Sequence, residues 1–112
     1  MDPIYTEIEF ERFESVPGPF YQDLKSVPTT IIYREYFDGL ERLAVILLND
    51  RNRRDVRKIA TAHKVKIVLM HDVTQGRLSE IEKGLFPCID GYDTREGKYW
   101  TGEFLHRDRL AS

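Results

Sequence analysis

The sequence predicts an α+β domain of the ferredoxin-like type, a two-layer sandwich with the element order strand, helix, strand, strand, helix, strand. Residues 43–48 are apolar at every position, which is typical of a central strand covered on both faces. Asp38 and Gly39 precede this run and form a strong hairpin signal, because a type I′ turn needs positive φ at both positions. A second apolar run, residues 65–70, follows an amphipathic helix, so the two strands are expected to run parallel.

The first strand is expected at residues 4–13, where apolar and polar side chains alternate. The face that alternation assigns to the core carries Ile4, Thr6, Ile8 and Phe10, and the face it assigns to water carries Tyr5, Glu7, Glu9 and Glu11. We interpret this acidic face as a solvated surface that discourages wrong strand pairing. Pro17-Gly18-Pro19 ends the strand, and a short helix with its apolar side chains at helical spacing follows at residues 20–27, before Pro28.

The hairpin is expected over residues 30–49, and the second helix from about Asn52 to Lys64, capped by Asn49 or Asp50. Its inner face carries Val56, Ile59, Ala60 and His63, and its outer face is basic. After the second apolar run we expect a loop at residues 72–76 and a helix at residues 77–83, stopped by Gly84 and Pro87. A last strand, residues 99–105, pairs with residues 87–92 in this prediction.

The predicted organisation is a single domain, with a core at residues 4–72, a C-terminal extension at 73–106 and a frayed tail at 107–112. The chain has 17 basic and 19 acidic residues among 112, a net charge of −2 that argues against a general nucleic-acid or membrane binder. Cys88 is the one cysteine, which excludes an internal disulfide and a cysteine-based zinc site. We expect no metal and no cofactor. Because the N-terminus shows no secretion signal, we expect a cytoplasmic location.

The sharpest chemical candidate is a cluster at the ends of the two apolar strands. Asn49 and Asp50 follow the first, and His71 and Asp72 follow the second. Parallel strands end at the same edge of a sheet, so His71 could act as acid, base or ligand beside Asp50 and Asp72, with Glu7 as a further member. The simpler interpretation is structural: Asp50 caps the helix, Asp72 begins a loop and His71 marks the end of burial.

The second candidate is the basic start of the second helix, which includes Arg53, Arg54 and Arg57. Its charges suit an anion, a phosphate or an acidic partner, although most such runs are solvated helix faces. RNA recognition on a sheet of this type uses aromatic residues on the central strands, and residues 43–48 carry none. This argues against nucleic acid as the partner.

The third candidate is an aromatic C-terminal segment that contains Tyr92, Tyr99, Trp100 and Phe104. Such residues are enriched at protein interfaces, and they also cover open sheet faces. Because the usual catalytic motifs are missing, the leading expectation is a small non-enzymatic domain that binds a protein partner or a second copy of itself. The edge strand or this aromatic segment would form the contact, which in the case of self-association would give a homodimer. The alternatives are a small-ligand-binding or hydrolase-like site at the strand ends, and anion or nucleic-acid binding between Arg51 and Lys58.

Overall fold

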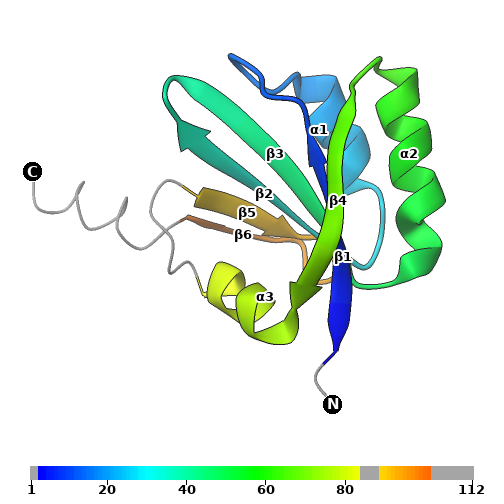
Figure 1. Cartoon of the computed structure of the whole chain (residues 1–112), viewed down its shortest axis with the longest axis vertical. Helices are drawn as coiled ribbons and strands as arrows, with labels where there is room; N and C mark the ends of the chain where they lie inside the picture. The colour runs from blue at the N-terminus through cyan, green and yellow to red at the C-terminus, as the bar shows by residue number, and fades with distance from the viewer. Residues whose placement is uncertain (1–2, 84–88, 102–112) are drawn as a thin grey trace, which may run out of the picture.

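The computed structural model describes residues 3–83 and 89–101, and it contains six strands and three helices there. In chain order the elements are β1 (Ile4–Phe10), α1 (Gly18–Lys25), β2 (Thr30–Phe37), β3 (Leu40–Leu47), a 3₁₀ turn (Asp50–Asn52), α2 (Arg53–Ala62), β4 (Ile67–Thr74), α3 (Gln75–Glu82), β5 (Ile89–Asp93) and β6 (Lys98–Thr101). The predicted alternation of strands and helices is therefore present, and α+β is the fold class (Figure 1).

All six strands form one antiparallel sheet in the order β4-β1-β3-β2-β5-β6. β1 lies between β3 and β4 and is antiparallel to both, with Thr6 opposite both Leu47 and Asp72. β3 and β4 consequently run parallel, as the two apolar runs predict. β4 and β6 are the edge strands, and in the described part of the chain no strand pairs with their outer sides.

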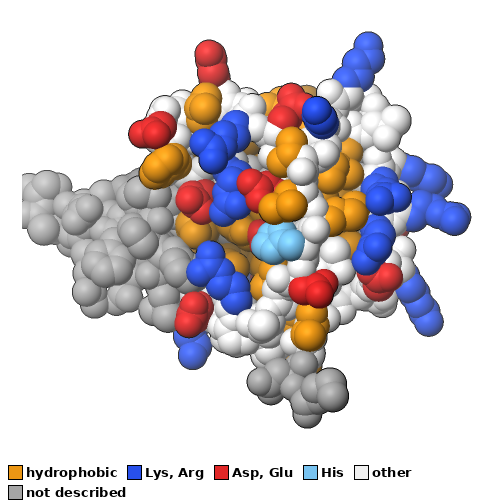
Figure 2. Space-filling model, viewed as in Figure 1, with side chains coloured by type: hydrophobic (Ala, Val, Ile, Leu, Met, Phe, Trp, Pro, Cys, Tyr) orange, Lys and Arg blue, Asp and Glu red, His pale blue; other side chains and the backbone are white. Residues whose placement is uncertain are grey.

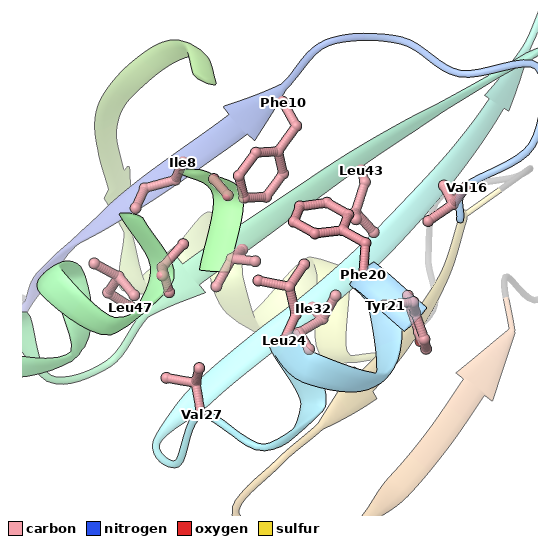
Figure 3. Close-up of a cluster of buried hydrophobic side chains, with 13 residues drawn as sticks. Ile8, Phe10, Val16, Phe20, Tyr21, Leu24, Val27, Ile32, Leu43 and Leu47 are labelled. Atoms are coloured by element: carbon pink, nitrogen blue, oxygen red, sulfur yellow. The ribbon is translucent and has the colours of Figure 1, made fainter. Parts of the chain in front are cut away.

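One face of the sheet is covered by α1 and α2, and the main core lies between these layers (Figures 1 and 3). Phe20 and Leu24 of α1 and Val56 of α2 are completely buried there. The Phe20 ring meets the edge of the Phe10 ring with centroids 5.1 Å apart, an arrangement that aromatic pairs favour. The predicted helix at residues 20–27 begins earlier, at Gly18, because proline at the next position suits the first turn of a helix.

The opposite face carries a smaller core under α3, in which Leu78 and Ile81 pack on side chains of β2 and β3. Trp100 of β6 joins this cluster by lying across Gly91 of β5. A Cβ atom added at Gly91 would overlap the indole ring, so only glycine lets Trp100 lie there. This explains why a glycine occupies the interior of a strand.

Three predictions about β1 and β4 are wrong: where β4 ends, that Glu7 is exposed and that Ile4 is buried. Residues 72–76 are not a loop: β4 continues to Thr74, and α3 begins at Gln75 with the Thr74 side chain as its N-cap. The acidic face of the first strand is not uniformly solvated, because Glu7 is 4% exposed. On the other face Ile4, expected in the core, is 62% exposed at the tip of β1. The part of the last predicted strand beyond Thr101 lies outside the described residues, as do Gly84, Pro87 and Cys88.

Substitution of Gly91 by alanine tests the packing of Trp100. We expect Gly91→Ala to lower the free energy of unfolding by about 1–3 kcal/mol, because an added methyl group must displace the indole ring or the strand. Gly76→Ala is the matched control, since a Cβ there meets only the Thr74 hydroxyl at 3.9 Å and alanine favours a helix. Urea unfolding of both variants measures the difference, and equal stabilities would contradict the packing.

Candidate functional site

The structure does not assemble the predicted strand-end cluster. β3 ends at Leu47, the Asn49 side chain accepts a hydrogen bond from the Arg51 amide at 3.0 Å, and Asp50 pairs with Arg53 at 2.7 Å. His71 and Asp72 lie inside β4, where consecutive side chains point to opposite faces. The meeting of Asp50, His71 and Asp72 on one ligand is therefore wrong, because β4 extends past the point at which the apolar run stops.

His71 contacts Glu7 instead, the residue directly opposite it on β1. The Nε2 atom of His71 lies 2.9 Å from one Glu7 carboxylate oxygen, and the Tyr33 hydroxyl donates a hydrogen bond to the other. The Glu7 side chain is 5% exposed, whereas that of His71 is 41% exposed. A buried carboxylate thus has a buried donor on one side and a solvent-facing imidazole on the other.

In the hydrogen bond between Tyr33 and Glu7, the buried phenol is the donor and the carboxylate is the acceptor. Desolvation by burial, followed by the charge and hydrogen bond of Glu7, raises the pKa of Tyr33 far above its ordinary value. The hydroxyl therefore keeps its proton through the physiological range and serves as a donor to Glu7. This contact compensates part of the cost of removing a carboxylate from water.

A second polar group on the same face is centred on Arg42 of β3. Its guanidinium group pairs with Glu9 at 3.1 Å and with Glu35 at 2.8 Å, and lies 5.8 Å from the centre of the Tyr33 ring. Burial acts to lower the pKa of Arg42, but the hydrogen bond to Glu35 and the nearby acidic groups raise it above its ordinary value. Each of these three charged side chains therefore has a partner of opposite charge, and this part of the face supports the sheet.

The outer edge of β4 presents backbone groups to solvent. The Gln75 amide bonds the Pro3 carbonyl at 3.2 Å, which makes these directly opposed residues a hydrogen-bonded pair. Hydrogen-bonded and non-hydrogen-bonded pairs alternate along an antiparallel ladder, so the amides and carbonyls of Met70, Asp72 and Thr74 point away from β1. This edge has the hydrogen-bonding pattern of a strand that lacks a neighbour.

Apolar side chains are also exposed along β4. Val68 is 51% exposed and Leu69 is 48% exposed, and Ile4 of β1 lies at the far end of the pair. Figure 2 shows hydrophobic side chains along β4 and between β4 and α2. The strand is eight residues long and contains neither lysine nor proline, the residues that commonly protect an edge from pairing. Val68 is an extra residue in a β-bulge, so the regular part of the edge runs from Leu69 to Thr74.

The outer side of α2 is basic (Figure 2, right). A hollow of about 610 Å³ there is lined by Asp50, Arg51, Arg53, Arg54, Arg57, Lys58, Thr61 and Ala62. Arg53 is turned towards Asp50 and the Thr6 hydroxyl, at 2.7 and 3.2 Å. Within residues 3–83 and 89–101, none of Arg51, Arg54, Arg57 and Lys58 has an acidic partner at ion-pair distance. The charge of this face is thus largely uncompensated.

A groove of about 410 Å³ separates α2 from β4 and opens beside the strand edge. Its lining residues are Arg57, Ala60, Thr61, Val65, Ile67 and Met70. Arg57 reaches across it, with a guanidinium nitrogen 3.8 Å from the Met70 sulfur. The groove is therefore lined by both apolar and basic side chains, and it shares Arg57 and Thr61 with the hollow on α2.

The predicted aromatic segment divides between the two faces of the sheet. Tyr92 and Tyr99 contact each other with centroids 4.6 Å apart, and the Lys25 ammonium group lies 4.6 and 4.7 Å from their rings. Trp100 packs on the opposite face, and Phe104 lies outside the described residues. Tyr99 is 61% exposed, but the other two rings make most of their contacts within the chain.

Three further findings bear on function. In the part of the chain that the structure describes, no group of three or more histidine, cysteine or acidic side chains is placed to hold a metal ion. None of the described helices has the length and apolar character needed to cross a membrane. No protein-family model, curated protein or solved structure matches the chain.

Replacing Tyr33 with phenylalanine tests the buried contact with Glu7. We expect Tyr33→Phe to reduce the free energy of unfolding by about 1–3 kcal/mol near neutral pH, because a buried carboxylate oxygen loses its donor. Tyr99→Phe, which removes an exposed phenol, is the matched control and should change stability much less.

The same variant has a distinct pH signature. A tyrosine whose pKa is raised by folding contributes stability that is complete below the unfolded value of about 10 and is lost as the pH rises above it. Tyr21 and Tyr33 both have raised pKa values, so stability should fall steeply above this pH. Tyr33→Phe should make that fall shallower by about 1.4 kcal/mol per pH unit, measured by urea unfolding at several alkaline pH values. An unchanged slope would show that Tyr33 is not held protonated by its surroundings.

Proposed function

We propose that the protein is an interaction domain that accepts an additional strand along the outer edge of β4, from another protein or from a second copy of the chain. The single observation that supports this most is the outer edge of β4, where the backbone groups of Met70, Asp72 and Thr74 point away from β1 and the side chains of Val68 and Leu69 are half-exposed. Strand addition uses such an edge for main-chain hydrogen bonds, and neighbouring side-chain pockets supply specificity.

Two features favour β4 over the aromatic segment as the contact. Trp100 and Tyr92 already pack against side chains of their own chain, which accounts for their positions without a partner. β4 lies beside a groove, so an added strand would gain side-chain contacts as well as backbone hydrogen bonds. A small-ligand site at the strand ends is less well supported, because Asp50 pairs with Arg53 and His71 contacts Glu7 and not Asp50 or Asp72.

We also propose that the first four strands and first two helices form a ferredoxin-like unit. The order β4-β1-β3-β2, the antiparallel pairing and the position of α1 and α2 on one face support this proposal. β5 and β6 then extend the sheet beyond β2, which leaves β4 as the exposed edge of the four-stranded unit. In this arrangement β5 and β6 cover the edge of the unit at β2, and the edge at β4 stays open among the described residues.

Asp72→Pro tests strand addition without breaking the sheet. The Asp72 amide points away from β1, so proline removes a donor from the outer edge and leaves the ladder to β1 intact. Peptides selected from a random display library on the wild-type domain should bind Asp72→Pro about tenfold more weakly or worse. Asp72→Ala, which keeps the backbone amide, should not show this loss of binding.

Two controls accompany this experiment. Circular dichroism and urea unfolding of both variants establish that each is folded, and sedimentation over a range of concentrations shows whether the domain itself associates through β4. Self-association that Asp72→Pro abolishes would identify a second copy as the partner. Peptides that bind Asp72→Pro and the wild type equally, with no self-association, would refute strand addition at β4.

A further inference from the structure

We infer that the strand added to β4 comes from an acidic, extended segment of a different protein, with acidic side chains that face α2 alternating with apolar ones. This inference rests on the proposed function, because it needs a strand at that edge. It commits further to the chemistry of the partner, and it excludes a second copy of this chain and a nucleic acid as the preferred occupant.

The position of the groove sets which side chains of the partner would enter it. Ile67 and Met70 of β4 face the same side of the sheet as α2, because the β-bulge at Val68 shifts the alternation, and Leu69 and His71 face the other side. Side chains of an added strand also alternate between faces, so every second one would lie between β4 and α2. The remaining ones would lie beside Leu69, which is 48% exposed.

The groove suits both the methylene groups and the carboxylate of a glutamate side chain. The apolar side chains among its lining residues, Ala60, Val65, Ile67 and Met70, would contact the methylene groups. The groove is also lined by Arg57, which lies 3.8 Å from the Met70 sulfur and has no acidic partner among the described residues. A carboxylate beside Arg57 would form a charge-assisted hydrogen bond.

Charge complementarity extends along α2. Arg54 and Lys58 line the hollow that adjoins the groove, and they also lack acidic partners in the part of the chain that the structure describes. The whole chain has a net charge of −2, so this basic face is a local concentration of charge and not a general property. Asp72, further along β4, limits the acid-binding stretch to the end of the strand near Ile67 and Met70.

A second copy of this chain fits the edge poorly. Antiparallel pairing of β4 with its own copy would relate the two chains by a twofold axis perpendicular to the sheet. Equivalent faces would then be continuous, and the two α2 helices would lie on the same side with their basic residues close together. Like charges placed across an interface oppose association, whereas an acidic segment would be attracted.

A nucleic acid also fits less well. Single strands bind proteins through basic grooves combined with aromatic side chains on which bases stack. Neither the groove nor the adjoining hollow is lined by an aromatic residue. The solvent-directed amides and carbonyls of Met70 and Asp72 match the repeat of a polypeptide strand, which a sugar–phosphate chain lacks.

The test uses four fluorescent probes and measures binding by anisotropy. Three are capped peptides of about eight residues, the length of β4, in which valine alternates with glutamate, lysine or threonine. The fourth is a single-stranded oligothymidine. We expect the glutamate peptide to bind most tightly, to weaken as salt rises from about 0.05 to about 0.5 M, and to lose affinity for Asp72→Pro.

Two charge reversals locate the contact. Arg57→Glu should weaken binding of the glutamate peptide about tenfold and strengthen binding of the lysine peptide. Lys98→Glu makes the same change of charge on β6 at the opposite edge of the sheet, and it should leave both affinities unaltered. Urea unfolding confirms that both variants are folded.

The outcomes separate this inference from the function on which it rests. If the threonine peptide binds as tightly as the glutamate peptide, and both depend on the edge changed by Asp72→Pro, strand addition stands and the acidic preference is refuted. Tight binding of oligothymidine with weak binding of all three peptides would identify a nucleic-acid surface and overturn the inference. If no peptide binds at about 1 mM, both the inference and strand addition at β4 are overturned.

Discussion

The pairing of β1 with strands on both sides is the constraint on which the rest of the structure depends. β1 is antiparallel to β3 and to β4, so it determines that these two strands run parallel and that β4 becomes an edge. The same register places Ile8 in the main core and Glu7 directly opposite His71. A slip of one residue would exchange these two faces, and it would expose the core residues of β1 while burying its acidic ones.

This register buries the Glu7 carboxylate, which costs free energy, and the partners of Glu7 reduce that cost. A carboxylate that is removed from water destabilises a folded protein unless hydrogen-bond partners replace the lost solvation. Tyr33 of β2 and His71 of β4 provide those partners from two other strands, so one side chain links three strands across the face under α3. His71 is the one member of the group that reaches solvent, and it lies on the strand whose outer edge we propose as the binding site.

Segments with a regular pattern of apolar residues were predicted correctly from the sequence, and segments with an irregular pattern were not. The uninterrupted apolar run at residues 43–48 identified the central strand, and Asp38-Gly39 identified the hairpin, since both signals are local. The end of β4 was missed because its apolar run stops at Met70, whereas an edge strand tolerates polar residues such as His71 and Asp72.

Glu7 was predicted to face water because the alternation of side chains shows which residues share a face but not what covers that face. α3 and the Tyr33 side chain make that face partly buried, and both are distant from Glu7 in sequence. The basic residues of α2 were recognisable from sequence, but their groove beside β4 required the fold.

The central claim is that the outer edge of β4 is open in the isolated domain, and amide hydrogen exchange tests it most directly. The amides of Leu69, His71 and Val73 point towards β1 and should be protected, whereas those of Met70 and Asp72 should exchange at nearly unprotected rates. Addition of a bound acidic peptide should slow exchange at Met70 and Asp72 and leave the other three unchanged. Equal and strong protection of all five amides in the isolated monomer would show that the edge is already covered, and it would contradict the account.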